Sequence, residues 1–430
     1  MPKVKQKTFQ APKGMRDILP DEQIYWQKFI KVAEVLAQDY GWQKIETPIL
    51  EDAEIFVRGT GQATDIVTKQ MYTLRTPGGA RLALRPEQTP SVIRAYLENG
   101  MNNWPHPVKL YYFGPMFRYE QPQAGRYRQL YQFGVETIGE KGAVLDVQII
   151  QFCFHLFKGL GLKKINVQIN SLGCERCRGA YRRALVDYYR YRKNKLCPDC
   201  QRRLKENPLR LLDCKEEKCQ PLKVQAPATV SYLCEECHRH FKDVLEFLDE
   251  LEIPYFLNNT LVRGLDYYTK TIFEFFLEET HGVAPLALGG GGRYDNLIKD
   301  LGGKDTPAVG MAIGVDRVVM AMKQQQIKVS QSYNPKIFLV QLGDMGRRKS
   351  LKLFDLLYQS GIIAAESLSR DSIGSQLKIA DRLGVKYSLI LGQQEALDGT
   401  IIIRDMQSGV QETVPQDKII DQIKKRLAKK

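Results

Sequence analysis

The sequence predicts an α+β domain that is interrupted by a small, mostly helical, cysteine-rich insert and followed by a C-terminal α/β domain. The chain of 430 residues is longer than the roughly 250–300 residues over which one hydrophobic core usually grows. Eight of its nine cysteines lie between Cys174 and Cys237, and the apolar pattern becomes βα-like after residue 335. We therefore expect a first domain made of residues 1–172 and 256–326, with the insert at residues 173–255 between its two parts. A linker at residues 327–334 leads to the last domain at residues 335–430.

Composition excludes several classes of protein. A hydrophobic content of 43% supplies ample core material, which excludes a disordered or collagen-like chain. We find no apolar run that approaches the roughly 20 residues needed to cross a bilayer, so we expect a cytoplasmic protein without a membrane partner. The net charge of +14 predicts a polyanionic partner. Charge alone does not distinguish nucleic acid from a membrane surface, and nucleic acid is the working hypothesis.

The first predicted element is an amphipathic helix over residues 21–40. Apolar residues recur there at helical spacing, Pro20 precedes them and Gly41 follows them. Two extended runs come next, at residues 108–113 and 127–138, and a polar loop joins them. This arrangement predicts a pair of neighbouring antiparallel strands.

The second of these strands carries the first sign of chemistry. Successive side chains of a strand point to opposite faces, so Arg126, Leu130, Gln132 and Glu136 share one face. A buried strand rarely places such polar residues on one side unless that side faces a ligand or water. Arg118, at the end of the preceding strand, would lie beside this face. Two guanidinium groups over one sheet suit a triphosphate, while the alternative for an isolated strand is a solvated sheet face.

The later part of the first domain predicts more strands, a glycine-dense stretch at residues 289–292, and a helix that opens near Gly314. The segment Gly310-x3-Gly314-x2-Arg317, which is strand-like and then helical, contains a third arginine. This spacing is a weak motif alone, and it becomes stronger together with Pro48 and Phe117-Arg118-x-Glu120.

The C-terminal pattern begins with a strand at residues 337–341 and a helix at residues 348–360. A further strand at residues 388–391 precedes a strand pair. The alternation of strands and helices predicts an α/β domain of about 95 residues, which is an ordinary domain size.

These motifs resemble those of the class II aminoacyl-tRNA synthetases, and within that class those of the histidyl-tRNA synthetases. Residues 41–48, 117–136 and 307–317 resemble motifs 1, 2 and 3 of the class. Residues 261–268 (Leu-Val-Arg-Gly-Leu-Asp-Tyr-Tyr) and 84–90 (Leu-Arg-Pro-Glu-Gln-Thr-Pro) are similar to histidine-specific motifs. With the C-terminal domain, which resembles an anticodon-binding domain, the resemblance covers nearly the whole chain.

The resemblance implies ATP-dependent ligation of L-histidine to its tRNA through a histidyl-adenylate, with release of AMP and pyrophosphate. It also implies a homodimer, and ATP bound with Mg²⁺. By matching motifs, Arg118, Gln132 and Arg263 become the catalytic residues, with Arg263 stabilising the transition state at the α-phosphate. The residues implied for ATP binding are Arg118, Glu120, Arg126, Leu130 and Arg317. Those implied for histidine binding are Glu87, Gln88, Thr89, Gln132, Glu136, Tyr267 and Tyr268.

Three positions depart from the family pattern. Leu130 stands where a phenylalanine usually stacks on adenine, which predicts weaker ATP binding or compensation by another residue. Gln121 replaces an arginine of the motif 2 loop, which bears on the reading of the extra 5′ guanosine of histidine tRNA. Asp316 stands where glutamate is frequent.

The cysteines form four pairs with the spacing of metal ligands, Cys174-x2-Cys177, Cys197-x2-Cys200, Cys214-x4-Cys219 and Cys234-x2-Cys237. They are enough for two tetrahedral zinc sites, whereas disulfides are not expected in a reducing cytoplasm. Thiols without a metal are the alternative, and the resemblance itself implies no metal here. Residues 174–240 carry 16 Lys and Arg against 9 Asp and Glu, a net charge of +7. This excess suggests contact with tRNA, with a solvated surface as the alternative.

Two other functions account for only part of the sequence. A non-catalytic paralogue, the regulatory subunit of an ATP phosphoribosyltransferase, typically lacks the C-terminal domain and loses catalytic motifs, whereas this chain keeps Arg118, Arg263, Arg317 and residues 335–430. A zinc-ribbon nucleic-acid-binding protein would leave Glu87 and Tyr268 unexplained.

Overall fold

The computed structural model describes residues 9–278, 286–329, 334–369 and 372–428. Its contacts divide the chain into two units, residues 1–329 and 330–430. Residues 330–333, inside the predicted linker 327–334, lie outside the described residues, as do Lys429 and Lys430. Each unit is described by itself below.

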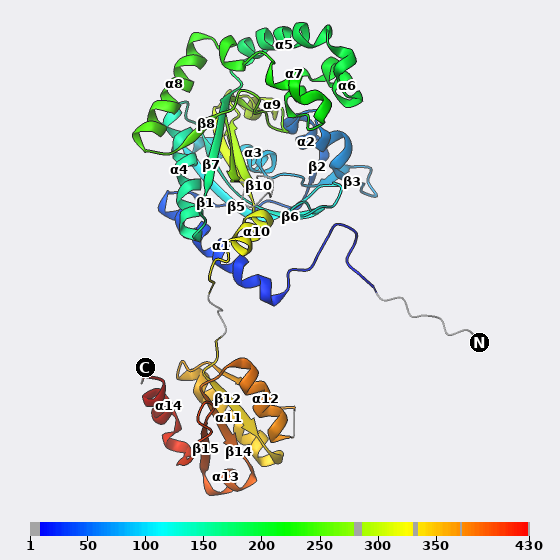
Figure 1. Cartoon of the computed structure of the whole chain (residues 1–430). Coiled ribbons are helices and arrows are strands. Elements are labelled where there is room, and N and C mark those ends of the chain that lie inside the picture. The colour runs from blue at the N-terminus through cyan, green and yellow to red at the C-terminus, as the bar shows by residue number, and fades with distance from the viewer. Residues whose placement is uncertain (1–8, 279–285, 330–333, 370–371, 429–430) are drawn as a thin grey trace, which may run out of the picture. The chain divides into compact units, whose positions relative to one another are not determined.

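The first unit is built on an eight-stranded sheet with the order β1-β5-β6-β11-β10-β9-β7-β8 (Figure 1). Its strands are antiparallel except for the parallel pairs β1·β5 and β7·β8. The predicted hairpin is confirmed, since β5 and β6 pair from Val108↔Ile138 to Phe117↔Gln129. The strand bounds are β1 Gln43–Lys44, β5 Val108–Phe117, β6 Gln129–Ile138, β7 Ile165–Ser171, β8 Tyr255–Leu257, β9 Thr269–Leu277, β10 Leu286–Arg293 and β11 Ala308–Gly314.

Helices cover both faces of this sheet. One face packs against α1 (Pro20–Asp39), α4 (Ala143–Leu160), α8 (Glu235–Glu250) and α10 (Val315–Gln324), and Phe133 and Val135 of β6 point into that core. The opposite face packs against α3 (Thr89–Glu98) and α9 (Leu297–Asp300). Next to them lie α2 (Ala53–Thr60) and a three-stranded sheet of β2 (Leu50–Asp52), β4 (Arg81–Leu84) and β3 (Tyr72–Arg75).

Helix α4 corrects one expectation from the sequence. Within the described part of the chain it is the one helix that is long and apolar enough, by length and composition, to cross a membrane. In the structure it packs against α1 and α8, and most of its apolar side chains, Phe152 and Leu156 among them, are buried in the core, while Val144 near its start is exposed. Its hydropathy is therefore that of a central core helix.

The insert is mostly helical, as predicted. Helices α5 (Glu175–Arg190), α6 (Pro198–Glu206) and α7 (Gln220–Val224) gather at one end of the large sheet in Figure 1, and α8 leads back to the sheet. Short 3₁₀ turns connect them, including η3 (Lys193–Lys195) and η4 (Pro208–Asp213). The small core of this region combines tyrosine and leucine side chains with four of the cysteines.

The second unit is an α/β domain, as predicted. Its five-stranded sheet has the order β13-β12-β14-β15-β16 and carries its own hydrophobic cores. The predicted helix at residues 348–360 begins earlier, at Gly343. The bounds are β12 Ile337–Gln341, α11 Gly343–Gln359, β13 Ala364–Glu366, α12 Ile373–Leu383, β14 Tyr387–Leu391, α13 Gln393–Asp398, β15 Thr400–Asp405, β16 Gln411–Pro415 and α14 Ile419–Ala428.

Candidate functional site

A cavity of about 1100 Å³ opens in the first unit between the large sheet, the loop before β9 and the insert. Nearly all the site residues expected from the sequence line it. They are Glu87, Gln88, Thr89, Arg118, Glu120, Arg126, Leu130, Gln132, Arg263, Tyr267, Tyr268 and Arg317. Glu136 is the exception, because it lies one layer below the cavity wall and contacts wall residues.

Glu136 is fully buried on β6. Its Oε1 accepts a hydrogen bond from Thr89 Oγ1 at 2.6 Å, and its Oε2 accepts one from the hydroxyl of Tyr294. Burial raises the pKa of this carboxyl to about 8, and the charge of nearby Glu87 acts in the same direction. Space for the carboxylate exists because residue 310 on β11 is glycine, since a Cβ there would lie 1.7 Å from Oε2.

Glu87 is a second enclosed carboxyl, just before α3. It accepts hydrogen bonds from Thr60 Oγ1 at 2.5 Å and from the Tyr267 hydroxyl at 2.8 Å. Burial raises its pKa as well. Tyr267 therefore supports Glu87, while its neighbour Tyr268 lines the cavity and is held through its backbone oxygen by Arg178 of the insert.

Two glutamines in the cavity wall have spare hydrogen-bonding capacity. Gln88 donates through Nε2 to Thr47 Oγ1 at 2.8 Å. Within the described part of the chain, the buried Oε1 atoms of Gln88 and Gln132 have no hydrogen-bond partner. An unpaired buried amide oxygen is costly, so the Gln132 oxygen marks a place for a ligand donor.

Three arginines converge on another part of the cavity wall. Arg118 donates through Nε to Pro86 O at 2.8 Å, and Arg126 lies 3.8 Å from the Glu120 carboxylate. Arg317 donates to Gly125 O at 3.1 Å and to Ala287 O at 2.9 Å. Burial and the charge of Arg126 lower the pKa of Arg317, which is the effect expected of a guanidinium that lies close to another cation.

Arg263, in the loop before β9, lines the same cavity as the three other arginines. Its Nη1 pairs with Glu274 of β9 at 2.7 Å, and it passes so close to Gly290 that a Cβ there would lie 2.8 Å from the same nitrogen. From the insert, Arg210 donates to Arg263 O at 3.1 Å. The glycine-dense strand β10 thus makes room for the guanidinium.

Sequence reasoning missed several of these supporting residues. Tyr294, Glu274 and Thr60 were not singled out, although each bonds a predicted residue. The sequence does contain a signal for Glu274, because it is a carboxylate among the apolar residues of β9. Tyr294 and Thr60 carry no such signal, because their partners are distant in the chain.

The three residues that depart from the family pattern lie in different parts of the first unit. Leu130 lines the cavity, as expected of a residue beside the nucleotide, while Gln121 is exposed in the β5–β6 loop. Asp316 accepts hydrogen bonds from Tyr131 N and Arg16, each at 3.0 Å, so its carboxylate holds the N-terminal segment and β6 together.

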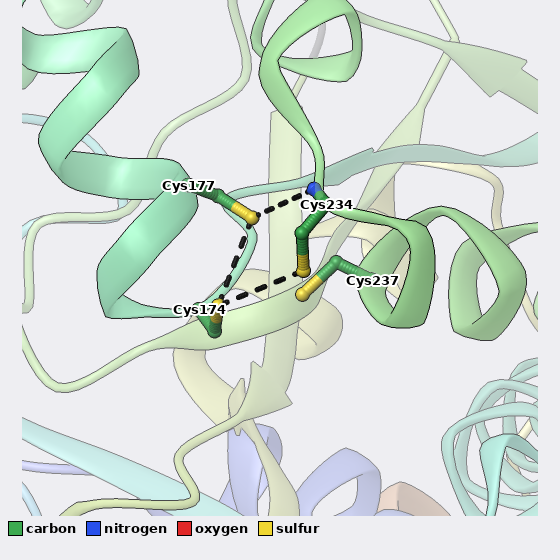
Figure 2. Close-up of side chains that lie close together, drawn as sticks. All are labelled: Cys174, Cys177, Cys234 and Cys237. Carbon is green, nitrogen blue, oxygen red and sulfur yellow. Dashed lines mark hydrogen bonds between the residues drawn. The ribbon is translucent and has the colours of Figure 1, made fainter.

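The eight cysteines of the insert form two groups of four. In one group are Cys174, Cys177, Cys234 and Cys237, which Figure 2 shows with their sulfur atoms facing one another. In the other are Cys197, Cys200, Cys214 and Cys219.

Comparison with known proteins gives consistent matches. Residues 14–185 and 194–318 match the family described as histidyl-tRNA synthetase, and residues 336–426 match an anticodon binding domain. A histidine–tRNA ligase of Dehalococcoides mccartyi is 45% identical over 97% of this chain and 100% of its own length. One of Acetivibrio thermocellus is 43% identical over 96% of this chain and 99% of its own. The crystal structure of apo S. aureus histidyl-tRNA synthetase superposes with a TM-score of 0.80 at 34% identity, covering 96% of this chain and 99% of that one.

Proposed function

The chain belongs to the histidyl-tRNA synthetase family, and from this premise we propose that it joins L-histidine to its tRNA in an ATP-dependent reaction. Histidine and ATP would form a histidyl-adenylate with release of pyrophosphate, and transfer to the tRNA would release AMP. The observation that carries the proposal is one cavity with the enclosed carboxyl group of Glu87 in its wall, that of Glu136 directly behind the wall, and a separate set of arginines. The first set suits a cationic or hydrogen-bond-donating amino acid, and the second suits a triphosphate.

The carboxyl groups are the proposed determinants of histidine binding. Glu136 and the Tyr268 hydroxyl would read the two imidazole nitrogens, with Thr89 and Tyr294 orienting Glu136. Glu87 and the unpaired Gln132 oxygen would accept from the α-ammonium group. A carboxylate and a phenol on opposite ring nitrogens select imidazole against apolar side chains of similar size.

The arginines are the proposed phosphate ligands. Arg118 would hold the α-phosphate, while Arg126 and Arg317 would bind the terminal phosphates and the adenine face, beside Leu130. Arg263 would stabilise the charge that develops on the α-phosphate as the histidine carboxylate attacks it. Mg²⁺ would arrive with ATP as part of the substrate, and Glu120 is a cavity carboxylate of the kind this ion prefers.

The assembly and the tRNA contacts are also proposals. Membership of the family supports a homodimer of C₂ symmetry, a cytoplasmic location, and anticodon binding by the second unit. Sedimentation at micromolar concentration would test the dimer, which should have about twice the chain mass of 49.3 kDa.

The experiment that tests the function is ATP–pyrophosphate exchange with each of the twenty amino acids. Exchange should depend on histidine, and Arg263→Ala should slow it by about 10²–10³ while histidine binding changes little. Arg239→Ala, at an exposed position on α8, is the control for loss of an arginine. Exchange driven by another amino acid would contradict the proposed specificity, and a near-normal rate for Arg263→Ala would remove its role.

A further inference from the structure

The insert brings eight thiols into two groups whose geometry calls for a central ion. Within each group all four sulfur atoms lie within 4.8 Å of one another. The sulfur of Cys174 lies 3.7 Å from that of Cys177 and 3.9 Å from that of Cys234, and those of Cys197 and Cys214 are 3.8 Å apart. Zinc binds thiolates at about 2.3 Å, so a tetrahedron of such bonds has an edge of about 3.8 Å. We propose that the insert binds two structural zinc ions, one in each group of four cysteines.

The distances argue against the other uses of paired cysteines. A disulfide needs a sulfur–sulfur distance of about 2.05 Å, roughly half of what is seen in either group. An iron–sulfur cluster places its own iron and sulfide atoms between the ligands, which would hold the cysteine sulfurs farther apart. Tetrahedral coordination by four thiolates is the arrangement that zinc takes in structural sites.

The local backbone is arranged as in a thiolate site. Cys174, Cys197 and Cys234 each stand immediately before the first residue of a helix, and the second cysteine of each pair lies in the first turn. Helix N-termini favour negative charge and therefore thiolates. Backbone N–H groups also point at the sulfurs, from Cys234 to Cys177 at 3.0 Å and from Cys197 to Cys219 at 3.3 Å. Such hydrogen bonds orient metal ligands.

The ions would add to the stability of an insert whose own hydrophobic core is small. Helices α6 and α7 have 9 and 5 residues, and 3₁₀ turns make up much of the rest. Helices of this length are marginal without tertiary support. Metal ligation supplies folding free energy to small domains of this kind.

Each ion would hold the insert at a different point. The group around Cys174 and Cys237 joins the start of α5 to the start of α8, so it pins the two ends of the insert together, as Figure 2 shows. The group around Cys214 follows η4, whose Arg210 donates to Arg263 O. Zinc in this second group would therefore hold η4 beside the loop that carries Arg263.

Metal analysis of the full chain, purified without an affinity tag or chelator, tests the proposal. We expect two zinc ions per chain by mass spectrometry of the metals. The double variants Cys174→Ser with Cys177→Ser and Cys197→Ser with Cys200→Ser should each retain one. Cys153→Ala is the matched control, because Cys153 is a lone buried thiol on α4 and its loss should leave both ions in place.

A second measurement does not depend on the variants folding. The wild-type chain refolded with cobalt(II) in place of zinc should show the visible bands of tetrahedral thiolate coordination, and added zinc should bleach them. Absence of zinc together with absence of these bands would overturn the proposal, as would iron in place of zinc or disulfides found by mass mapping. If the wild-type chain held one zinc ion, the double variant that still retained this ion would identify the group that does not bind zinc. The proposal would then be overturned for that group.

Discussion

At position 310 only glycine leaves room for the carboxylate that we place against the histidine ring. A Cβ there would lie 1.7 Å from Glu136 Oε2 and 2.8 Å from Val135 O, and the second contact is to backbone that cannot move aside. Gly310→Ala should therefore displace Glu136 and raise the KM for histidine more than tenfold. The overpacked core should lose about 1–3 kcal/mol of stability, while the KM for ATP changes little. Exchange kinetics and thermal unfolding give these quantities.

Gly179→Ala is the control for the added methyl group. Gly179 lies in helix α5 with no atom within 4 Å of the added Cβ. Alanine should stabilise this helix by about 0.5–1 kcal/mol and leave both KM values unchanged. A normal KM for histidine in Gly310→Ala would show that Glu136 does not touch the substrate.

The raised pKa of Glu136 predicts a pH dependence with a defined sign. With a pKa of about 8, the carboxyl is mostly protonated at pH 7 and mostly ionised at pH 8.5. Only the ionised form accepts fully from an imidazole N–H, and free imidazole is already neutral above its pKa of about 6.5. The KM for histidine should therefore fall as pH rises, by roughly eightfold between pH 7 and 8.5.

Glu136→Gln separates this effect from the titration of histidine itself. The amide keeps an acceptor oxygen and has no charge to gain, so the variant should lose the fall in KM over the same range. Any slope that it retains belongs to the substrate. Equal slopes in wild type and variant would exclude Glu136 as the titrating group.

Individual site residues could be predicted from the sequence where the alternation of side chains along a strand shows which of them share a face. Alternation along β6 placed Gln132 and Glu136 on one face; Gln132 lines the cavity, and Glu136 lies behind the wall and bonds the wall residue Thr89. The partner of Glu136, Tyr294, is 158 residues away, and no local pattern encodes that contact. The assignment of roles depended on motif resemblance for the same reason.

At the scale of elements, a buried ion pair ties helix α4 to strand β10. Asp146 and Arg293 are both fully buried, and two nitrogens of Arg293 donate to Asp146 Oδ2 at 2.7 and 2.9 Å. His240 of α8 approaches the other carboxylate oxygen at 3.4 Å, so the pair also holds the helix that ends the insert. Asp146→Ala should lower the free energy of unfolding by about 3–5 kcal/mol, because it leaves the buried guanidinium of Arg293 with the more distant Asp295, at 3.3 Å, as its remaining carboxylate partner.

Chemical denaturation measures this loss, and α8 itself offers the control. Arg239 and Glu235 form an exposed i,i+4 pair on that helix. Arg239→Ala should cost less than about 1 kcal/mol. Similar losses in the two variants would mean that the buried pair contributes no more than a surface pair.

The elements themselves were predicted to different degrees. The hairpin β5–β6 and helix α1 were read correctly because both have a clear period and breakers at their ends. The glycine-dense stretch gave no strand signal, since glycine weakens strands, and yet it forms β10. The neighbouring strand explains the need for glycine in β10. A Cβ at Gly291 would lie 2.0 Å from Gly310 O on β11, so a larger residue does not fit there.

On the scale of the whole molecule, the two units were foreseen from the change in apolar pattern near residue 335, and each has its own hydrophobic core. The role of the insert was less visible. Its charge suggested contact with tRNA, and in the structure Arg178 and Arg210 of the insert also donate to the backbone of Tyr268 and Arg263. The insert thus also supports the cavity, so its charge is better tested by neutralisation than by deletion.

The last prediction uses this charge. Arg183 on α5 and Lys193 and Lys195 on η3 are exposed in a region with a net charge of +7. If they contact tRNA phosphates, changing all three to Gln should weaken tRNA binding and reduce the slope of log K against log salt by about 1–3, since each phosphate contact contributes close to one. Histidine-dependent pyrophosphate exchange should stay normal, because none of the three lines the cavity.

The matched control removes the same charge from another surface. Lys31, Lys158 and Lys163 are exposed on or beside α1 and α4, on the opposite face of the sheet from the cavity. Their change to Gln lowers the net charge equally, so any loss of long-range attraction is the same in both triple variants. A salt slope that falls only in the insert variant locates the phosphate contacts there. Equal changes in the two variants would mean that tRNA responds to the net charge alone, and the excess charge of the insert would then be a solvated surface.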